Sequence, residues 1–243
     1  MATQTNQRGK KSLKRTTESN TSHPFRQQCC STTCASETIL LHPDKAIYWP
    51  AKNTLLVADV HLGKEHAFSR AGSAIPSGPS EADIFRLANL VDASGAERLV
   101  ILGDLMHSRP GNNEQWLKTL SLFLDDRPRL MVDVVAGNHD QPTAQQLIDS
   151  RIRWHANKLL DEPFVYQHEP GHDPRGHVLC GHIHPCYRLT ANRADSIRAP
   201  VFWFTAQHTV LPSFGQFTGG HNVVPEKGDR LFMVGPDCVV SLK

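Results

Sequence analysis

Several apolar runs in this sequence end in acidic, amide or imidazole side chains, the residue types that bind metal ions and transfer protons. The clearest is the run 130–135, which leads into Gly137, Asn138 and His139. A run this rich in β-branched residues, stopped by glycine, predicts a buried strand. Three more apolar runs end at such polar residues: 55–58 before Asp59 and His61, 99–102 before Gly103 and Asp104, and 178–180 before Gly181, His182 and His184.

Open α/β sheets carry their chemistry at the carboxyl ends of strands, so we expect these side chains to converge. With His168, which follows another predicted strand, they supply two carboxylates, one amide oxygen and four imidazoles, with a fifth imidazole beside them. This donor set suits a pair of borderline divalent cations, namely manganese, iron or zinc, rather than magnesium alone. The candidate ligands are Asp59, His61, Asp104, Asn138, His168, His182 and His184, with His139 as their neighbour.

The spacing of these residues suggests how two metals would share them. Asp59 and His61 are two positions apart, so at a strand end they point to the same side and reach one metal. His182 and His184 have the same spacing. A shared carboxylate is needed to hold two metals about 3.5–4 Å apart, and Asp104, alone after its strand, is the natural bridge.

The rest of the chain predicts one domain that follows a flexible arm. Residues 1–36 are polar and basic, with almost no large apolar side chains, so we expect a disordered amino-terminal arm. Residues 37–243 begin with β-α-β units and continue as short strands, which predicts two sheets with outer helices. Helices are expected at 81–93, capped by Ser80, and at about 114–125.

Composition restricts the compartment and the class of partner. The 243 residues carry a formal net charge of +2, which is close to neutral, so the net charge alone does not indicate a nucleic-acid-binding protein. The six cysteines have no disulfide-framework spacing, and Cys29, Cys30 and Cys34 are expected to be reduced thiols. No signal peptide or membrane span is recognisable, and we expect a cytoplasmic protein.

In chain order, the strand-end residues resemble the five motifs of the binuclear metallophosphoesterase superfamily. These motifs are Asp59–Val60–His61, Gly103–Asp104, Gly137–Asn138–His139–Asp140, His168 and Gly181–His182–Ile183–His184. The sequence around these motifs is similar to that of a narrower group, the ligase-associated DNA damage response endonuclease (PdeM) family. That similarity includes residues 42–44, 59–65, 103–109, 168–170, 181–185 and 214–220, and it extends over roughly residues 37 to 242.

The resemblance implies a four-layer αββα sandwich of two mixed sheets flanked by helices. It implies a manganese-dependent phosphodiesterase that cuts single-stranded DNA, acting in DNA repair near an ATP-dependent DNA ligase, an exonuclease and a helicase. Motif matching gives two ligand sets: Asp59, His61, Asp104 and His184 for one metal, and Asp104, Asn138, His168 and His182 for the other.

The expected reaction is in-line attack on a phosphodiester by a hydroxide held between the two cations. His139 is expected to donate a proton or a hydrogen bond to the leaving oxygen, and Asp140 to orient the His139 imidazole. The candidate phosphate-binding residues, on loops beside the metals, are Lys64, Arg70 and Arg109. The alternative interpretation of these three is that they are ordinary solvated surface charges. The histidines interpreted as ordinary surface or core residues are His66, His107, His155, His172, His177, His208 and His221.

Two other function classes stay open from the sequence. The same metal pair serves hydrolases of small phosphoesters or phosphoproteins, which would turn over such a substrate faster than DNA. The chain could also be a non-catalytic partner-binding module on the same scaffold. Proteins that lose catalysis usually lose ligands, and here every ligand position is filled.

Overall fold

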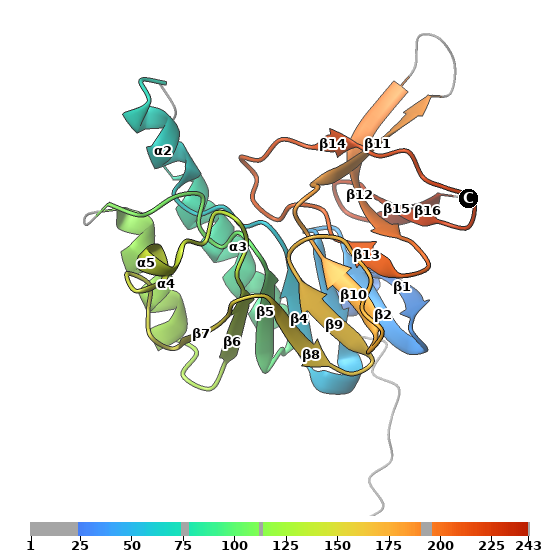
Figure 1. Cartoon of the computed structure of the whole chain (residues 1–243), viewed down its shortest axis with the longest axis horizontal. Helices are drawn as coiled ribbons and strands as arrows, with labels where there is room; N and C mark the ends of the chain where they lie inside the picture. Colours follow the sequence, from blue (N-terminus) through green and yellow to red (C-terminus); the bar gives the residue numbers. More distant parts are fainter. Residues whose placement is uncertain (1–23, 74–77, 112–113, 191–195, 243) are drawn as a thin grey trace, which may run out of the picture.

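Two β-sheets packed face to face form the body of the protein (Figure 1). The computed structural model describes residues 24–73, 78–111, 114–190 and 196–242. The first sheet has seven strands in chain order; β1 to β4 are antiparallel and β4 to β7 are parallel. Its strands are β1 (Cys30–Cys34), β2 (Glu37–His42), β3 (Ala46–Trp49), β4 (Thr54–Val57), β5 (Arg98–Leu102), β6 (Met131–Val135) and β7 (Ile152–His155).

The second sheet is also mixed and has nine strands. Its main path runs in the order β14, β11, β12, β13, β10, β9 and β8, and β15 and β16 extend it from β12. The strands are β8 (Lys158–Asp161), β9 (Phe164–Gln167), β10 (His177–Cys180), β11 (Pro185–Thr190), β12 (Ser196–Phe204), β13 (His208–Val210), β14 (His221–Asn222), β15 (Arg230–Val234) and β16 (Val239–Leu242).

The alternation of side chains along the strands builds a core on each face of the first sheet. In β4, Leu56 points between the sheets, whereas Leu55 and Val57 point toward the helices. The core between the sheets is rich in aromatic residues from the second sheet, among them Phe164 and Phe202, which are both fully buried. Burying one such side chain stabilises a fold by about 1.5–3 kcal/mol, so this core supports the polar edge described below.

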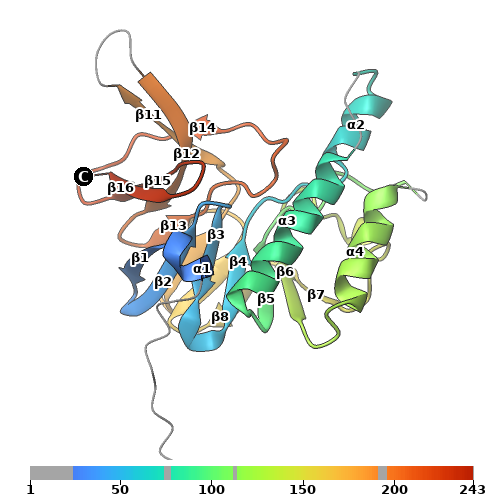
Figure 2. The ribbon, with the colours of Figure 1, turned by 180° about the vertical axis from the view of Figure 1, so that it is seen from behind.

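All of the described helices precede β7, and the long ones cover the outer face of the first sheet (Figure 2). They are α1 (Pro24–Gln28), the 3₁₀ helix η1 (Pro50–Lys52), α2 (Lys64–Arg70), α3 (Pro79–Ser94), α4 (Gln115–Asp125) and α5 (Pro142–Gln145). The predicted α/β sandwich of two mixed sheets is confirmed. The expected fourth layer is absent from the described residues, because the segments after residue 151 are short runs interrupted by turn residues. None of the described helices is both long and apolar enough to span a bilayer.

Two sequence boundaries are corrected by the structure. The predicted arm of residues 1–36 contains α1 and β1; residues 1–23 lie outside the described part. Phe25 is 3% exposed and stacks on His42 with ring centroids 4.8 Å apart, and β1 pairs with β2. This segment is ordered, although its composition is polar, because one aromatic side chain is buried and one strand pairs at the edge of the sheet. Helix α3 begins at Pro79, and the Ser80 hydroxyl donates to Glu65 instead of capping the helix.

Candidate metal centre

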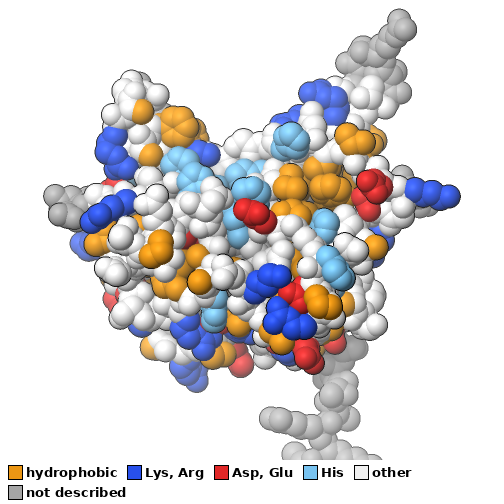
Figure 3. Space-filling model, viewed as in Figure 1, with side chains coloured by type: hydrophobic (Ala, Val, Ile, Leu, Met, Phe, Trp, Pro, Cys, Tyr) orange, Lys and Arg blue, Asp and Glu red, His pale blue; other side chains and the backbone are white. Residues whose placement is uncertain are grey.

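The carboxyl ends of β4, β5, β6, β9 and β10 meet at one edge of the sandwich, where the predicted ligands converge. Backbone hydrogen bonds hold their loops together: the amide of His61 donates to the carbonyl oxygen of Asp104 (2.8 Å), and the amide of Gly181 donates to the carbonyl oxygen of His168 (2.9 Å). On the surface, histidine side chains gather in the hollow between the projections formed by α2 and by the β11–β12 hairpin (Figure 3). The predicted convergence is therefore present in the fold.

The first group of donor atoms comes from β4, β5 and the loop after β10. His61 Nε2 lies 3.2 Å from His184 Nε2. His184 Nε2 lies 3.6 Å from Asp59 Oδ1, and His61 Nε2 lies 3.8 Å from Asp104 Oδ2. Ligands of one cation, each about 2.0–2.2 Å from it, lie roughly 3–4 Å from each other, so these spacings suit a single divalent ion.

The second group is centred on His168 and adjoins the first. His168 Nε2 lies 3.0 Å from both Asn138 Oδ1 and His182 Nδ1, and 3.5 Å from Asp104 Oδ2. Asp104 Oδ2 therefore belongs to both groups, as expected of a bridging carboxylate. The donor chemistry and spacing of the residues present fit a pair of divalent cations.

His182 and His184 fall into different groups, so the expectation that their spacing of two gives them the same direction is wrong. That argument requires an extended backbone, whereas their φ angles are 69° and 51°, in the left-handed region. Asp59 adjoins both groups, since its Oδ1 also lies 3.8 Å from His168 Nδ1.

Left-handed backbone is concentrated at this centre. Among the described residues, nine non-glycine residues have positive φ, and five of these are candidate ligands: Asp59, His61, Asp104, His182 and His184. Such conformations are uncommon for residues with a Cβ, and each costs about 1–3 kcal/mol. Their clustering indicates that the fold maintains strain here to aim these side chains.

A glycine directly precedes three of the candidate ligands and makes room for a ligand from a neighbouring strand. A Cβ added at Gly103 would overlap the His168 ring, and one at Gly137 would overlap the Asp104 carboxylate. A Cβ at Gly181 would overlap the Asp59 carboxylate. The three glycines thus permit the close approach of strand ends on which the donor spacing depends.

Burial controls the charge of the central groups. It lowers the pKa of His61 to about 2, helped by the neighbouring His184 and Lys64. His61 is therefore neutral near pH 7, the form in which imidazole binds metals. Burial also raises the pKa of the Asp104 carboxyl above its ordinary value, which a nearby cation would oppose.

The fold is similar to that of a solved nuclease. The crystal structure of Pseudomonas putida nuclease MPE superposes with a TM-score of 0.73 at 35% sequence identity, over 88% of this chain and 100% of that chain. The chain belongs to the MPE family of metallophosphoesterase nucleases. Membership in the MPE family confirms the resemblance seen in the sequence and makes the protein a hydrolytic phosphodiesterase.

A second solved structure, the E. coli phosphoesterase Yfce, gives a TM-score of only 0.38 at 19% identity, over 76% of this chain and 88% of that chain. No family model and no curated protein matches the chain. Assignment to the MPE family therefore depends on the Pseudomonas putida nuclease.

His139 lies beside the two donor groups and is held by two hydrogen bonds. Its amide donates to Asp104 Oδ1 (3.0 Å), and its Nδ1–H donates to the carbonyl oxygen of His107 (2.6 Å). Because Nδ1 is engaged, only Nε2 is free to interact with a substrate. A general acid or hydrogen-bond donor held in this way is pre-oriented.

His107, which we interpreted from the sequence as an ordinary histidine, is part of this site. Its ring stacks on His139 with centroids 4.8 Å apart and lies 5.5 Å from the ring of His61. Its nitrogens, with those of His61 and His139, form a further group of possible metal donors. Its position in the loop after β5 was the signal that could have identified it.

Asp140 does not orient the His139 imidazole, so that prediction is wrong. Its buried carboxylate accepts hydrogen bonds from the amides of Gly137 (3.0 Å), Leu105 (3.2 Å) and Met106 (3.0 Å). Burial nevertheless raises the pKa of Asp140 to about 6. Asp140 acts as a positioning residue that ties the loop after β5 to the loop after β6.

The three candidate phosphate-binding residues have different surroundings. Lys64 lies at the start of α2; burial lowers its pKa, and the charge of Asp104 opposes that shift. Arg70, at the far end of α2, donates hydrogen bonds to the side chains of Glu114 and Ser108. Arg109 is exposed on the loop after His107. Among the three, Lys64 is electrostatically coupled to the candidate centre.

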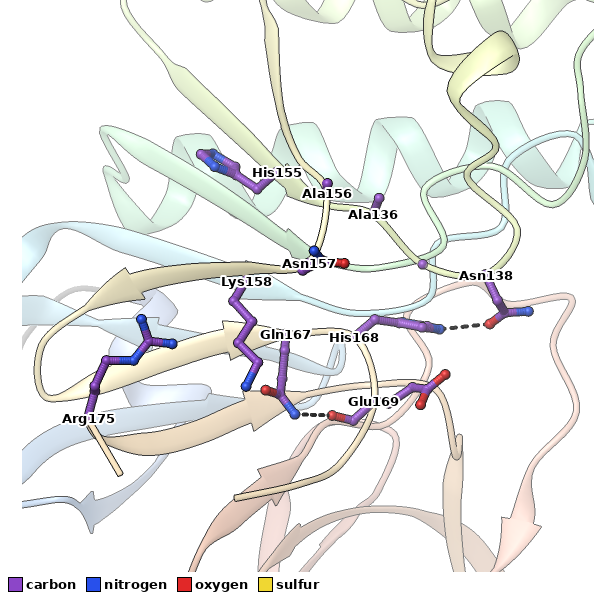
Figure 4. A pocket seen from close by; sticks show the side chains of 11 residues that line it. Ala136, Asn138, His155, Ala156, Asn157, Lys158, Gln167, His168, Glu169 and Arg175 are labelled. Carbon is purple, nitrogen blue, oxygen red and sulfur yellow. Dashed lines mark hydrogen bonds between the residues drawn. The ribbon is translucent and has the colours of Figure 1, made fainter. Parts of the chain in front are cut away.

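A cavity of about 1000 Å³ opens beside the second donor group. Figure 4 shows Asn138 and His168 toward one end of it and Arg175 at the other. The cations of Lys158 and Arg175 both pair with the carboxylate of Asp173, at 2.9 and 2.8 Å. The candidate centre thus adjoins enough open space for a polymeric substrate.

Proposed function

We propose that this protein is a manganese-dependent endonuclease that cleaves single-stranded DNA. The observation that carries the proposal is that Asp104 Oδ2 is shared by two donor groups in a chain of the MPE nuclease family. The proposed role in DNA repair beside an ATP-dependent DNA ligase, an exonuclease and a helicase is supported by the sequence resemblance.

The proposed cation pair is assigned to the two donor groups. One ion would be held by Asp59, His61, Asp104 and His184, and the other by Asp104, Asn138, His168 and His182. When bound, the two cations would lower the pKa of the attacking water and neutralise charge on the phosphoryl group. The mixture of imidazole and oxygen donors favours manganese, iron or zinc over magnesium alone.

The protein's own groups prepare the site for this reaction. The loops after β5 and β6 are joined through Asp140, which fixes Asp104 and Asn138 relative to each other. His139, held through Nδ1, presents Nε2 to the leaving oxygen and donates its proton there in the imidazolium form. Lys64 adds positive charge on the side of α2.

Replacing His139 by alanine is expected to lower kcat by about 10²–10⁴-fold, because it removes a positioned proton donor. Metal affinity should change little, since His139 contributes no donor to either proposed set. The measurement is kcat beside calorimetric titration with Mn²⁺. A variant that loses both ions would place His139 among the ligands instead.

The function itself is tested with purified protein, Mn²⁺ and circular single-stranded DNA. We expect nicking that disappears in excess chelator and returns when Mn²⁺ is restored. Activity that persists in saturating chelator would refute the metal mechanism. Turnover of a small chromogenic phosphodiester without nicking would favour a small-substrate hydrolase, and inactivity on both would favour a non-catalytic module.

A further inference from the structure

Two exposed phenylalanines from distant parts of the chain meet at the rim of the candidate centre. Phe68 on α2 is 39% exposed, and Phe217, in the loop before β14, is 41% exposed. Their rings touch edge to face, with centroids 6.0 Å apart and planes at 89°. Large aromatic side chains usually avoid water, so an exposed pair beside a polar site suggests a ligand surface.

The loop that carries Phe217 contains one phenylalanine that is part of the core and one that is exposed. Phe214, three positions earlier, is fully buried, and the Arg86 guanidinium lies 3.8 Å from its ring centroid. The loop is therefore anchored at Phe214, whereas Phe217 projects toward α2. Core packing explains the first phenylalanine and leaves the exposure of the second unexplained.

From Phe68, aromatic contacts continue inward to the candidate ligands. The Phe68 ring lies 6.1 Å from that of His107, and the two planes differ by 18°. The His107 ring in turn stacks on His139 and lies 5.5 Å from His61. A flat group resting on Phe68 would thus be nearly parallel to His107 and close to the reacting phosphate.

The charge of this rim suits a strand of nucleic acid. Lys64 precedes Phe68 by one helical turn, and Arg70, which pairs with Glu114, has a side chain that is 51% exposed. In the space-filling view, hydrophobic and basic side chains adjoin the histidines on the projection formed by α2 (Figure 3). Basic groups beside exposed aromatic rings are the combination that binds single-stranded nucleic acids.

We propose that Phe68 and Phe217 form a stacking platform for an unpaired nucleobase next to the phosphodiester that is cleaved. This inference rests on the proposed nuclease function and adds the residues that select the strand. In a duplex the faces of a base are covered by its neighbours, whereas an unpaired base can stack on a protein ring. The platform would therefore favour single strands.

The test compares Phe68→Ala and Phe217→Ala with the wild-type protein. The control is Phe85→Ala, since Phe85 is 63% exposed on α3. We expect each platform variant to bind a labelled single-stranded oligonucleotide about 5- to 100-fold more weakly, the usual effect of losing one stacked base. Phe68→Trp should keep the affinity, Phe85→Ala should be unchanged, and both platform variants should lose less on a small chromogenic phosphodiester than on the oligonucleotide.

An abasic substitution placed at successive positions of the oligonucleotide completes the test. At one position near the cleaved bond it should weaken binding to wild type yet have little further effect on Phe68→Ala. Unchanged oligonucleotide binding in both platform variants, or an equal loss on the small phosphodiester, would overturn the platform while leaving the nuclease function intact. Wild-type protein that hydrolyses the small ester but neither binds nor cuts the oligonucleotide would overturn both proposals.

Discussion

Replacing Asp104 by alanine is expected to reduce metal-dependent cleavage by at least about 10³-fold, because it removes several kcal/mol of transition-state stabilisation by the metal pair. The reason lies in the shared oxygen: Asp104 Oδ2 is 3.8 Å from His61 Nε2 and 3.5 Å from His168 Nε2. One substitution therefore removes a donor from both groups.

Calorimetric titration with Mn²⁺ distinguishes this shared role from a local one. Wild type should bind two ions, Asp104→Ala should lose tight binding of both, and His61→Ala should retain about one, since His61 belongs to a single group. Circular dichroism controls for folding. Two ions bound by Asp104→Ala with unchanged affinity would contradict the bridging role.

Replacing Gly137 by alanine is expected to eliminate most of the activity although glycine offers no reactive group. Its added methyl group would overlap the Asp104 carboxylate and crowd the Asp104 amide. Both belong to the backbone-anchored loop after β5, so the loops after β5 and β6 must separate. A displacement of about 1 Å in such a site costs roughly 10²-fold in rate.

Gly111→Ala is the matched control, because the nearest atom to its new methyl group would be a Glu114 side-chain oxygen at 3.4 Å, an ordinary contact. It should behave like wild type. Phosphodiester turnover and the Mn²⁺ affinity of both variants are the measurements, with thermal unfolding to compare stability. Near-normal turnover by Gly137→Ala would show that the approach of β5 and β6 is not needed.

The positions of the candidate ligands were predictable because they depend on sequence signals that the sandwich preserves. Apolar runs that stop at Gly-Asp or Gly-Asn fix both the strand and the end at which its polar residues emerge. The donors near Asp104, Asn138 and His168 therefore met as expected.

Other features depend on contacts that no local pattern encodes. His107 entered the site because its loop folds back against His139, and Asp140 turned away because three amides from two loops offered it hydrogen bonds. Phe25 became ordered by stacking on His42, on the neighbouring strand β2. In each case the deciding partner is brought near by the tertiary fold.

The left-handed φ angles of Asp59 and Asp104 restrict how this protein could diverge. Glycine relaxes such a backbone but has no donor atom, whereas β-branched residues are strongly disfavoured there. Asparagine shares both the conformational tolerance and an oxygen ligand with aspartate. The mutational routes that keep the backbone intact at these two positions are thus few, and they lead first to amides, which would change the charge of the centre before its shape.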